Sequence, residues 1–274
     1  MAAEKQVVVA KSNRLIEASY RLDLIEQRII LAAIVIARET QKGLDSSHLT
    51  IEAKRFALMY GIEGGGVYEQ LKRAMDSLFH RYVVIHDTDP ETGLPRVNNI
   101  RWVSKSSYVN GAGVIQLRFE PDMVPYISRL ESEFTTYRLE KIGHMTSVHA
   151  VRLYELLIQH LSIGTREIEI SWLKDALHLS DDYPRLYDFK KWVLDVAESQ
   201  INEHSDITVS HSQRKTGRAV THLVFDIKSK SEAKPTKKPK RPTVDDAYVK
   251  KHARPGESYD QALRRLLEDA GRAG

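Results

Sequence analysis

The sequence has 274 residues, of which 42% are hydrophobic and 28% are charged. These proportions are typical of globular proteins and exclude collagen-like and wholly disordered classes, and the length predicts two domains with extensions. The absence of cysteine excludes disulfides, thiolate nucleophiles and cysteine-based metal sites. Because we find neither a signal peptide nor an apolar run near the ~20 residues of a bilayer span, we expect a soluble, cytoplasmic protein with no membrane partner.

The excess positive charge is concentrated at the C-terminal end. Residues 1–140 carry 18 Lys and Arg against 18 Asp and Glu, and residues 141–228 carry 11 against 12. Residues 229–274 carry 12 against 7, so this segment accounts for the net charge of +4. A DNA-binding surface on the balanced body therefore requires locally clustered bases.

The first predicted module begins with an apolar helix at 23–39, followed by a short strand at 48–51 and a helix at 52–60. A glycine-rich turn at 61–66 precedes a third helix at 67–81, and a strand at 82–86 opens a wing. Further strands at 99–109 and 114–119 flank Asn110-Gly111, a strong hairpin signal. This enlarged sheet either pairs with a second subunit through its edge or is a solvated hairpin.

The second module repeats this order at a spacing near 119 residues. A helix at 147–161 and a strand at 166–170 precede a helix at 172–177, for which Ser171 is a candidate cap. A turn at 180–184, a third helix to about residue 202, and strands at 206–211 and 219–227 complete it. Apolar positions correspond between the copies: Ile51, Leu58, Tyr60, Leu71, Met75 and Leu78 with Ile170, Leu177, Leu179, Phe189, Val193 and Val196.

Helix, strand, helix, turn, helix and hairpin is the order of a winged helix. We therefore predict an α+β fold of two tandem winged-helix domains, at 7–140 and 141–228. A disordered basic linker at 229–256 and a short amphipathic helix at 257–271 follow. The linker either attracts DNA without sequence preference or only solubilises the chain, and the helix docks on the body or on a partner.

Candidate DNA contacts lie on the third helices and on the second wing. In winged helices the third helix enters the major groove, where bases meet phosphates or guanine edges and an aromatic ring meets a thymine methyl or a phosphate. Helical projection places Trp192 at the edge of the core rather than on DNA. The first-domain bases are equally consistent with a purely structural role. The candidates are Arg185, Tyr187, Lys190, Lys191, Arg214, Lys215 and Arg218, with Lys72 and Arg73 in the first domain.

Enzymatic motifs are absent or incomplete. Gly64-Gly65-Gly66 precedes a helix, but no Gly-Lys-Ser/Thr follows, so a P-loop is excluded. His149-Ala-Val-Arg152 matches a short tyrosine-recombinase motif without its downstream partners, and both side chains can be solvated on a helix. We find no paired carboxylates at metal-site spacing. We expect a binding protein without catalytic residues, metal or cofactor.

Several long motifs, in the same order, resemble the plasmid replication initiators of the RepE/RepA/π type, which bind iterons. The resemblance covers roughly residues 7–228 and rests on Asn13-Arg-Leu-Ile-Glu-Ala18, Glu26-Gln-Arg28, Phe134-Thr-Thr-Tyr-Arg-Leu139, Ala150-Val-Arg-Leu-Tyr-Glu155, the stretch 183–194 and the stretch 215–225.

The resemblance implies that a monomer binds iterons, the direct repeats of a plasmid origin, opens adjacent A/T-rich DNA, and recruits the host replicative helicase and the host initiator protein. It also implies that a homodimer, formed through the first domain, represses the initiator's own gene. The main base contacts fall on Arg185, Lys190 and Lys191, with the wing around 214–218 on the neighbouring backbone. Some relatives carry an arginine-rich run where this chain has Lys190-Lys191-Trp192, which gives Arg185 more weight in guanine readout. A transcriptional repressor without a replication role and a DNA-nicking enzyme are the alternatives.

Overall fold

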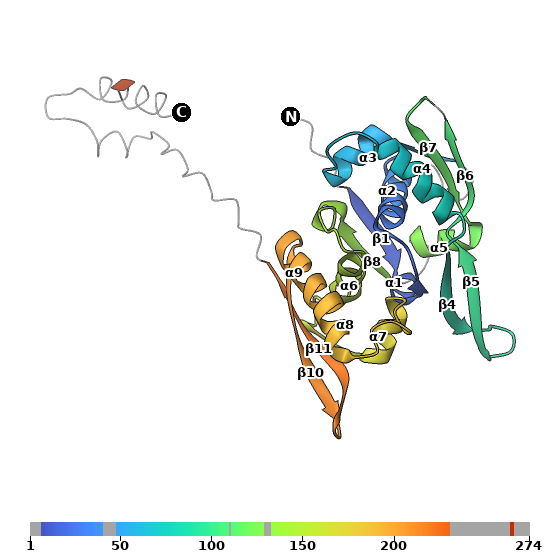
Figure 1. The fold of residues 1–274 in the computed structure, drawn as a ribbon. Helices are drawn as coiled ribbons and strands as arrows, with labels where there is room; N and C mark the ends of the chain where they lie inside the picture. The colour runs from blue at the N-terminus through green and yellow to red at the C-terminus, as the bar shows by residue number, and fades with distance from the viewer. Residues whose placement is uncertain (1–6, 41–47, 110, 129–132, 231–263, 266–274) are drawn as a thin grey trace. The chain divides into compact units, whose positions relative to one another are not determined.

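The computed structural model describes residues 7–40, 48–109, 111–128, 133–230 and 264–265 (Figure 1). The chain divides into two units, residues 1–230 and residues 231–274. Most of the predicted basic linker and terminal helix lies outside the described residues, although residues 264 and 265 are helical. In the described part of the chain, no helix is both long and apolar enough to cross a bilayer.

A short N-terminal segment precedes the first predicted helix. It contains β1 (Val8–Ser12), α1 (Asn13–Glu17) and β2 (Ser19–Tyr20). The Ser12 hydroxyl caps α1 by accepting a hydrogen bond of 3.2 Å from the backbone N–H of Leu15. Strand β1 pairs antiparallel with β8 (Phe134–Arg138), more than 120 residues later in the chain.

The first helix-turn-helix follows the predicted order. It consists of α2 (Leu24–Thr40), β3 (Leu49–Glu52), α3 (Ala53–Tyr60) and α4 (Val67–Leu78). A reciprocal cap fixes the start of α2, because Asp23 accepts from the backbone N–H of Glu26 while Glu26 accepts from that of Asp23. Helix α2 is apolar on most of its surface, and accordingly most of it is buried.

The strands of the first domain form two sheets. They are β4 (Tyr82–Thr88), β5 (Pro95–Arg101), β6 (Val103–Val109) and β7 (Val114–Phe119), in the orders β2-β4-β5 and β3-β7-β6. The single strand predicted at 99–109 is wrong, because the chain changes sheet at Trp102. That indole is fully buried and packs edge-on against Tyr20, with 5.1 Å between ring centroids. The predicted hairpin between β6 and β7 is confirmed.

Short helical segments connect the two domains. After β7 come η1 (Pro121–Met123) and α5 (Val124–Ile127), and after β8 comes η2 (Leu139–Lys141). The second module then begins with α6 (Val148–Ile158), whose N-cap Ser147 accepts from the backbone N–H of Ala150.

The second winged helix also has the predicted order. Its elements are β9 (Thr165–Glu169), α7 (Ile170–Ala176), α8 (Leu186–Phe189), the π-helical turn η3 (Lys190–Leu194), α9 (Asp195–His204), β10 (Ile207–Thr216) and β11 (Ala219–Ser229). The sheet order is β10-β11-β9. The cap predicted at Ser171 is wrong, because α7 begins two residues earlier than predicted, with Glu169 as its N-cap, and the Ser171 hydroxyl donates to Glu169 at 2.6 Å.

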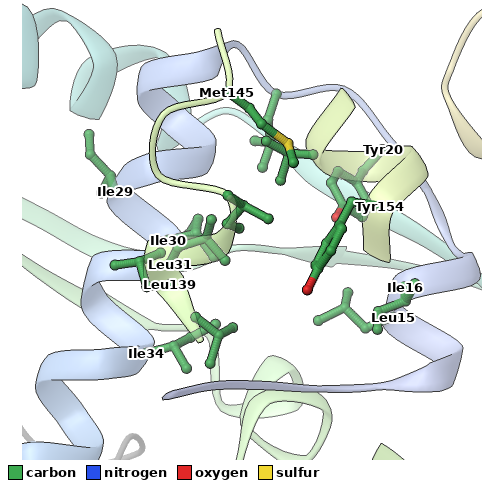
Figure 2. Packing of buried hydrophobic residues seen from close by; sticks show 14 of the residues in the cluster. Leu15, Ile16, Tyr20, Ile29, Ile30, Leu31, Ile34, Leu139, Met145 and Tyr154 are labelled. Carbon is green, nitrogen blue, oxygen red and sulfur yellow. The ribbon is translucent and has the colours of Figure 1, made fainter. Parts of the chain in front are cut away.

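One continuous apolar core extends through both modules. Figure 2 shows side chains of α1, α2 and α6 meeting in this cluster, among them Leu15, Ile30 and Tyr154. The correspondence between the two copies fails at two of the six pairs, because Leu58 is 84% exposed and Val196 is 37% exposed. The repeat is therefore one of element order rather than of residue-by-residue packing.

A buried charged cluster joins the N-terminal segment to α6. Lys11 forms an ion pair of 2.7 Å with Glu155, and both side chains are almost fully buried. Arg152, which could have been solvated on its helix, is buried instead. Its guanidinium is buried and donates to the backbone oxygens of Ala18 (2.8 Å) and Ala176 (3.1 Å). The His149-x-x-Arg152 motif is thus part of the packing between these segments.

Candidate nucleic-acid interface

The helix expected to enter the major groove is not a regular α-helix. It runs from Leu186 to His204 and widens at η3, where the backbone N–H of Asp195 donates to the oxygen of Lys190, five residues earlier. Val193, Leu194, Ala197 and Ile201 are buried, at the spacing of an amphipathic helix. The buried stripe therefore runs through Leu194 and Ala197 rather than through the expected Val196.

This change moves two side chains away from their expected places. The prediction that Trp192 belongs to the core edge is wrong, because 58% of its surface is exposed. Val196, predicted in the stripe, is partly exposed, and Leu194 and Ala197 are buried instead. The sequence signal for this was the spacing of Leu194, eight residues after Leu186, which belongs to a regular apolar stripe.

The helix presents the predicted bases and Tyr187. Arg185 is 79% exposed, and its Nε donates to Asp188 at 2.6 Å, which leaves the terminal nitrogens of the guanidinium outside that bond. Lys191 is exposed, with its ammonium 6.0 Å from the ring centroid of Tyr187 and 4.8 Å from that of Trp192. Lys190 is half-buried at the start of η3.

The turn before this helix is held by a lysine that sequence reasoning missed. The Lys174 ammonium donates to the backbone oxygens of Asp182 (2.9 Å) and Tyr183 (2.7 Å) and lies 5.5 Å from the ring centroid of Phe189. Tyr183 has a φ of 54° and His178 a φ of 58°, a left-handed conformation that is uncommon for residues other than glycine. Lys174 thus stabilises a strained turn that aims the helix.

The wing differs in shape from the prediction. We expected a loop over residues 212–218, but β10 and β11 pair as far as Thr216 and Ala219, so the turn is only Gly217-Arg218. Gly217 adopts a φ of 63°, as a tight hairpin turn of this kind requires. Of the predicted bases, Arg214 and Lys215 therefore lie on a strand, and only Arg218 lies in the turn.

The wing bases are exposed, and one of them is paired. Arg214 forms an ion pair of 2.6 Å with Glu167 of the neighbouring strand β9. Lys215 and Arg218 form no ion pair with any residue that the structure describes, and both are exposed. The wing therefore offers two unpaired cations at its tip and a third that an acid already partly neutralises.

Two polar side chains join the wing to the helix. The Asn202 amide donates to the backbone oxygen of Val209 (2.8 Å) and accepts from its N–H (2.7 Å). One turn earlier on α9, Glu198 meets His211 of β10 at 2.7 Å. These contacts hold α9 against β10 within the second domain, whose predicted bases lie near the start of the helix and at the end of the wing. Sequence reasoning missed Asn202 and His211, because nothing except their polarity distinguishes them in the sequence.

The first-domain bases form a separate group on α4. Lys72 lies 3.8 Å from Glu69 and 4.6 Å from the ring centroid of Tyr108 on β6. Arg73 is exposed, and its Nε donates to the backbone oxygen of Glu69 at 3.3 Å. Lys72 therefore has an acidic partner within the domain, whereas Arg73 forms no ion pair with a residue that the structure describes. In the described ranges we find no group of three or more His, Asp or Glu side chains that could hold a metal ion.

The fold and this surface define a tandem winged-helix protein. A model of the family described as "Initiator Replication protein, WH1" matches residues 8–158, and one described as "Initiator Rep protein, WH2" matches residues 169–227. The chain belongs to this family of initiator replication proteins, and two winged-helix domains are confirmed. The predicted boundary after residue 140 stays a prediction.

The chain is also similar to several known proteins. The crystal structure of the Pi initiator protein in complex with iteron DNA matches with a TM-score of 0.65 and 21% identity, over 82% of this chain and 98% of that chain. An uncharacterized 27.6 kDa protein of Escherichia coli is 24% identical, over 80% of this chain and 95% of the relative. The WH1 domain of MSBI1.176, a replication protein isolated from a multiple sclerosis patient, is 37% identical over 43% of this chain and 88% of that chain, with a TM-score of 0.36.

Proposed function

We propose that this chain binds directly repeated DNA sites at a plasmid replication origin as a monomer, with no catalytic activity of its own. The observation that carries the proposal is in the second domain, where the third helix and the wing present six exposed or half-buried cations. The Pi initiator, whose fold this chain shares, was crystallised on iteron DNA. Membership of the initiator family supports the same assignment.

Binding by two domains in one chain suits repeated sites on one face of a duplex. The second domain supplies the main base contacts, and Lys72 and Arg73 add backbone contacts from the first domain. In this proposal the bound monomers open adjacent A/T-rich DNA, where the host initiator protein and the replicative helicase assemble. Homodimers formed through the first domain repress the chain's own gene.

A footprint on the DNA that flanks the gene tests the proposal. Protection should recur at each direct repeat. The double variant K190A/K191A should bind these repeats more weakly than the wild type, with a loss of binding free energy of a few kcal/mol at most. Permanganate reactivity of thymines should appear in the adjacent A/T-rich tract once the repeats are filled. Protection of an isolated palindrome without opening would favour the repressor. A nicked or covalently linked product with divalent metal would show an enzyme and contradict the proposal.

A further inference from the structure

Exposed apolar side chains gather on the helix that carries the candidate DNA contacts. Ten large apolar side chains in the described ranges are exposed, and Tyr187, Trp192 and Val196 of this helix are three of them. Tyr187 is 69% exposed, the second highest value in the group. The helix therefore offers an apolar strip as well as cations.

Trp192 lies within the π-helical turn and on the exposed side of the helix. It follows the buried Phe189 by three residues, and in helical projection it lies about 60° from Phe189, on the side away from the buried Val193. The Lys191 ammonium lies 6.0 Å from the ring centroid of Tyr187 and 4.8 Å from that of Trp192. One cation is therefore close to both rings.

Such an arrangement is costly without a partner. Exposing an indole leaves a large apolar area in water, and π-helical turns are rare and occur frequently at functional sites. Trp192 makes no hydrogen bond with any side chain or backbone group that the structure describes, and 58% of its surface is exposed. Removing the ring should therefore cost the fold little.

We propose that Trp192, together with Tyr187, contacts the C5-methyl group of thymine in the major groove of the repeats and thereby determines which base is accepted there. This inference rests on the proposed function. The thymine methyl is the apolar group that a base pair presents on its major-groove edge. The strip lies beside three cations, so it suits a partner whose apolar groups are flanked by anions, as thymine methyl groups are flanked by phosphates. These cations are Arg185, Lys190 and Lys191. A protein partner with an apolar groove is the competing occupant.

Replacing thymine by deoxyuridine tests the contact, since it removes only the methyl group. Each thymine of a footprinted repeat would be replaced in turn, and the dissociation constants of the wild-type chain, W192A and I163A measured by fluorescence anisotropy. Ile163 is a matched control, because it is 66% exposed but lies outside the helix and the wing. At one or two positions deoxyuridine should weaken wild-type binding about fourfold, the worth of one buried methyl group.

The decisive observation is whether the effect of the thymine-to-deoxyuridine replacement depends on the Trp192 side chain. At those positions W192A should bind the thymine and deoxyuridine duplexes equally, whereas I163A should keep the fourfold difference. W192A should also keep the wild-type unfolding midpoint, because the indole is exposed.

If the wild-type chain protects the repeats but no thymine shows an effect that depends on Trp192, the contact is refuted and the proposed function stands. In that case, if W192A binds DNA with wild-type affinity but supports replication poorly in cells, the apolar strip binds a protein partner instead. If the wild-type chain does not bind the repeats, both proposals fail.

Discussion

Removing the two unpaired cations at the wing tip should change the salt dependence of DNA binding by a defined amount. The second-domain surface presents six cations, of which Arg185 and Arg214 are already paired with Asp188 and Glu167. Lys215 and Arg218 are exposed and lack an ion pair in the described part of the chain. They are therefore expected to release condensed counterions most fully when they meet phosphates.

The magnitude follows from the two phosphates that the variant no longer neutralises. Each phosphate neutralised on B-DNA contributes about −0.9 to the slope of log K against log salt concentration, so K215A/R218A should flatten that slope by about 1.8. Across a fourfold rise in salt, the wild type should then lose about twelvefold more affinity than the variant. Fluorescence anisotropy at several salt concentrations measures both slopes.

The control variant removes the same charge from outside the surface. Arg138 and Lys141 both lie near Glu140, at 3.5 and 3.8 Å, and R138A/K141A should leave the slope unchanged. The reasoning fails if the wing variant keeps the wild-type slope, or if the control flattens it as much as the wing variant does.

Three further predictions concern the packing that supports this surface. E155Q should leave the Lys11 charge buried without its partner and cost about 3–5 kcal/mol in the free energy of unfolding, measured in denaturant, with K11M added to E155Q restoring part of it. K174M should lower the free energy of unfolding by about 2 kcal/mol and weaken DNA binding, because two backbone oxygens of the turn lose a charged donor. DNA binding at wild-type strength would show that the turn does not orient the helix. Burial, and then the charge of Arg152, lower the pKa of His149 from 6.5. The contribution of neutral His149 to stability is therefore present above pH 6.5 and is lost as the pH falls through the lowered pKa. H149Q should reduce the loss of stability below pH 6.5, and a pH profile of stability equal to that of the wild type would contradict this.

The order of elements was predictable because each is locally encoded. Helical periodicity, the glycine turn at 61–66 and the Asn110-Gly111 hairpin signal are short-range patterns, and they predicted both winged helices. The basic character of the third helix and of the wing followed from the residues themselves. The strand at 99–109 was misjudged because it continues in sequence but divides between two sheets, and only the packing of Trp102 against Tyr20 separates them.

Features set by long-range contacts could not be predicted in the same way. The helical projection placed Val196 in the apolar stripe and Trp192 at its edge, whereas the buried stripe runs through Leu194 and Ala197 and leaves both exposed. The burial of Arg152 could not be predicted, because its hydrogen-bond partners Ala18 and Ala176 come from other segments. The same applies to Asn202, whose role depends on the strand that it meets.

The central claim is that this chain starts replication by binding DNA through the second-domain helix and wing. The most direct measurement is maintenance of a marked DNA circle that lacks an origin of its own and carries the gene with its flanking DNA. The wild-type gene should maintain the circle, and the variant K190A/K191A/K215A/R218A should lose it at normal protein levels, whereas R138A/K141A should keep it. Maintenance of the circle by the quadruple variant, or without the gene, would contradict the claim.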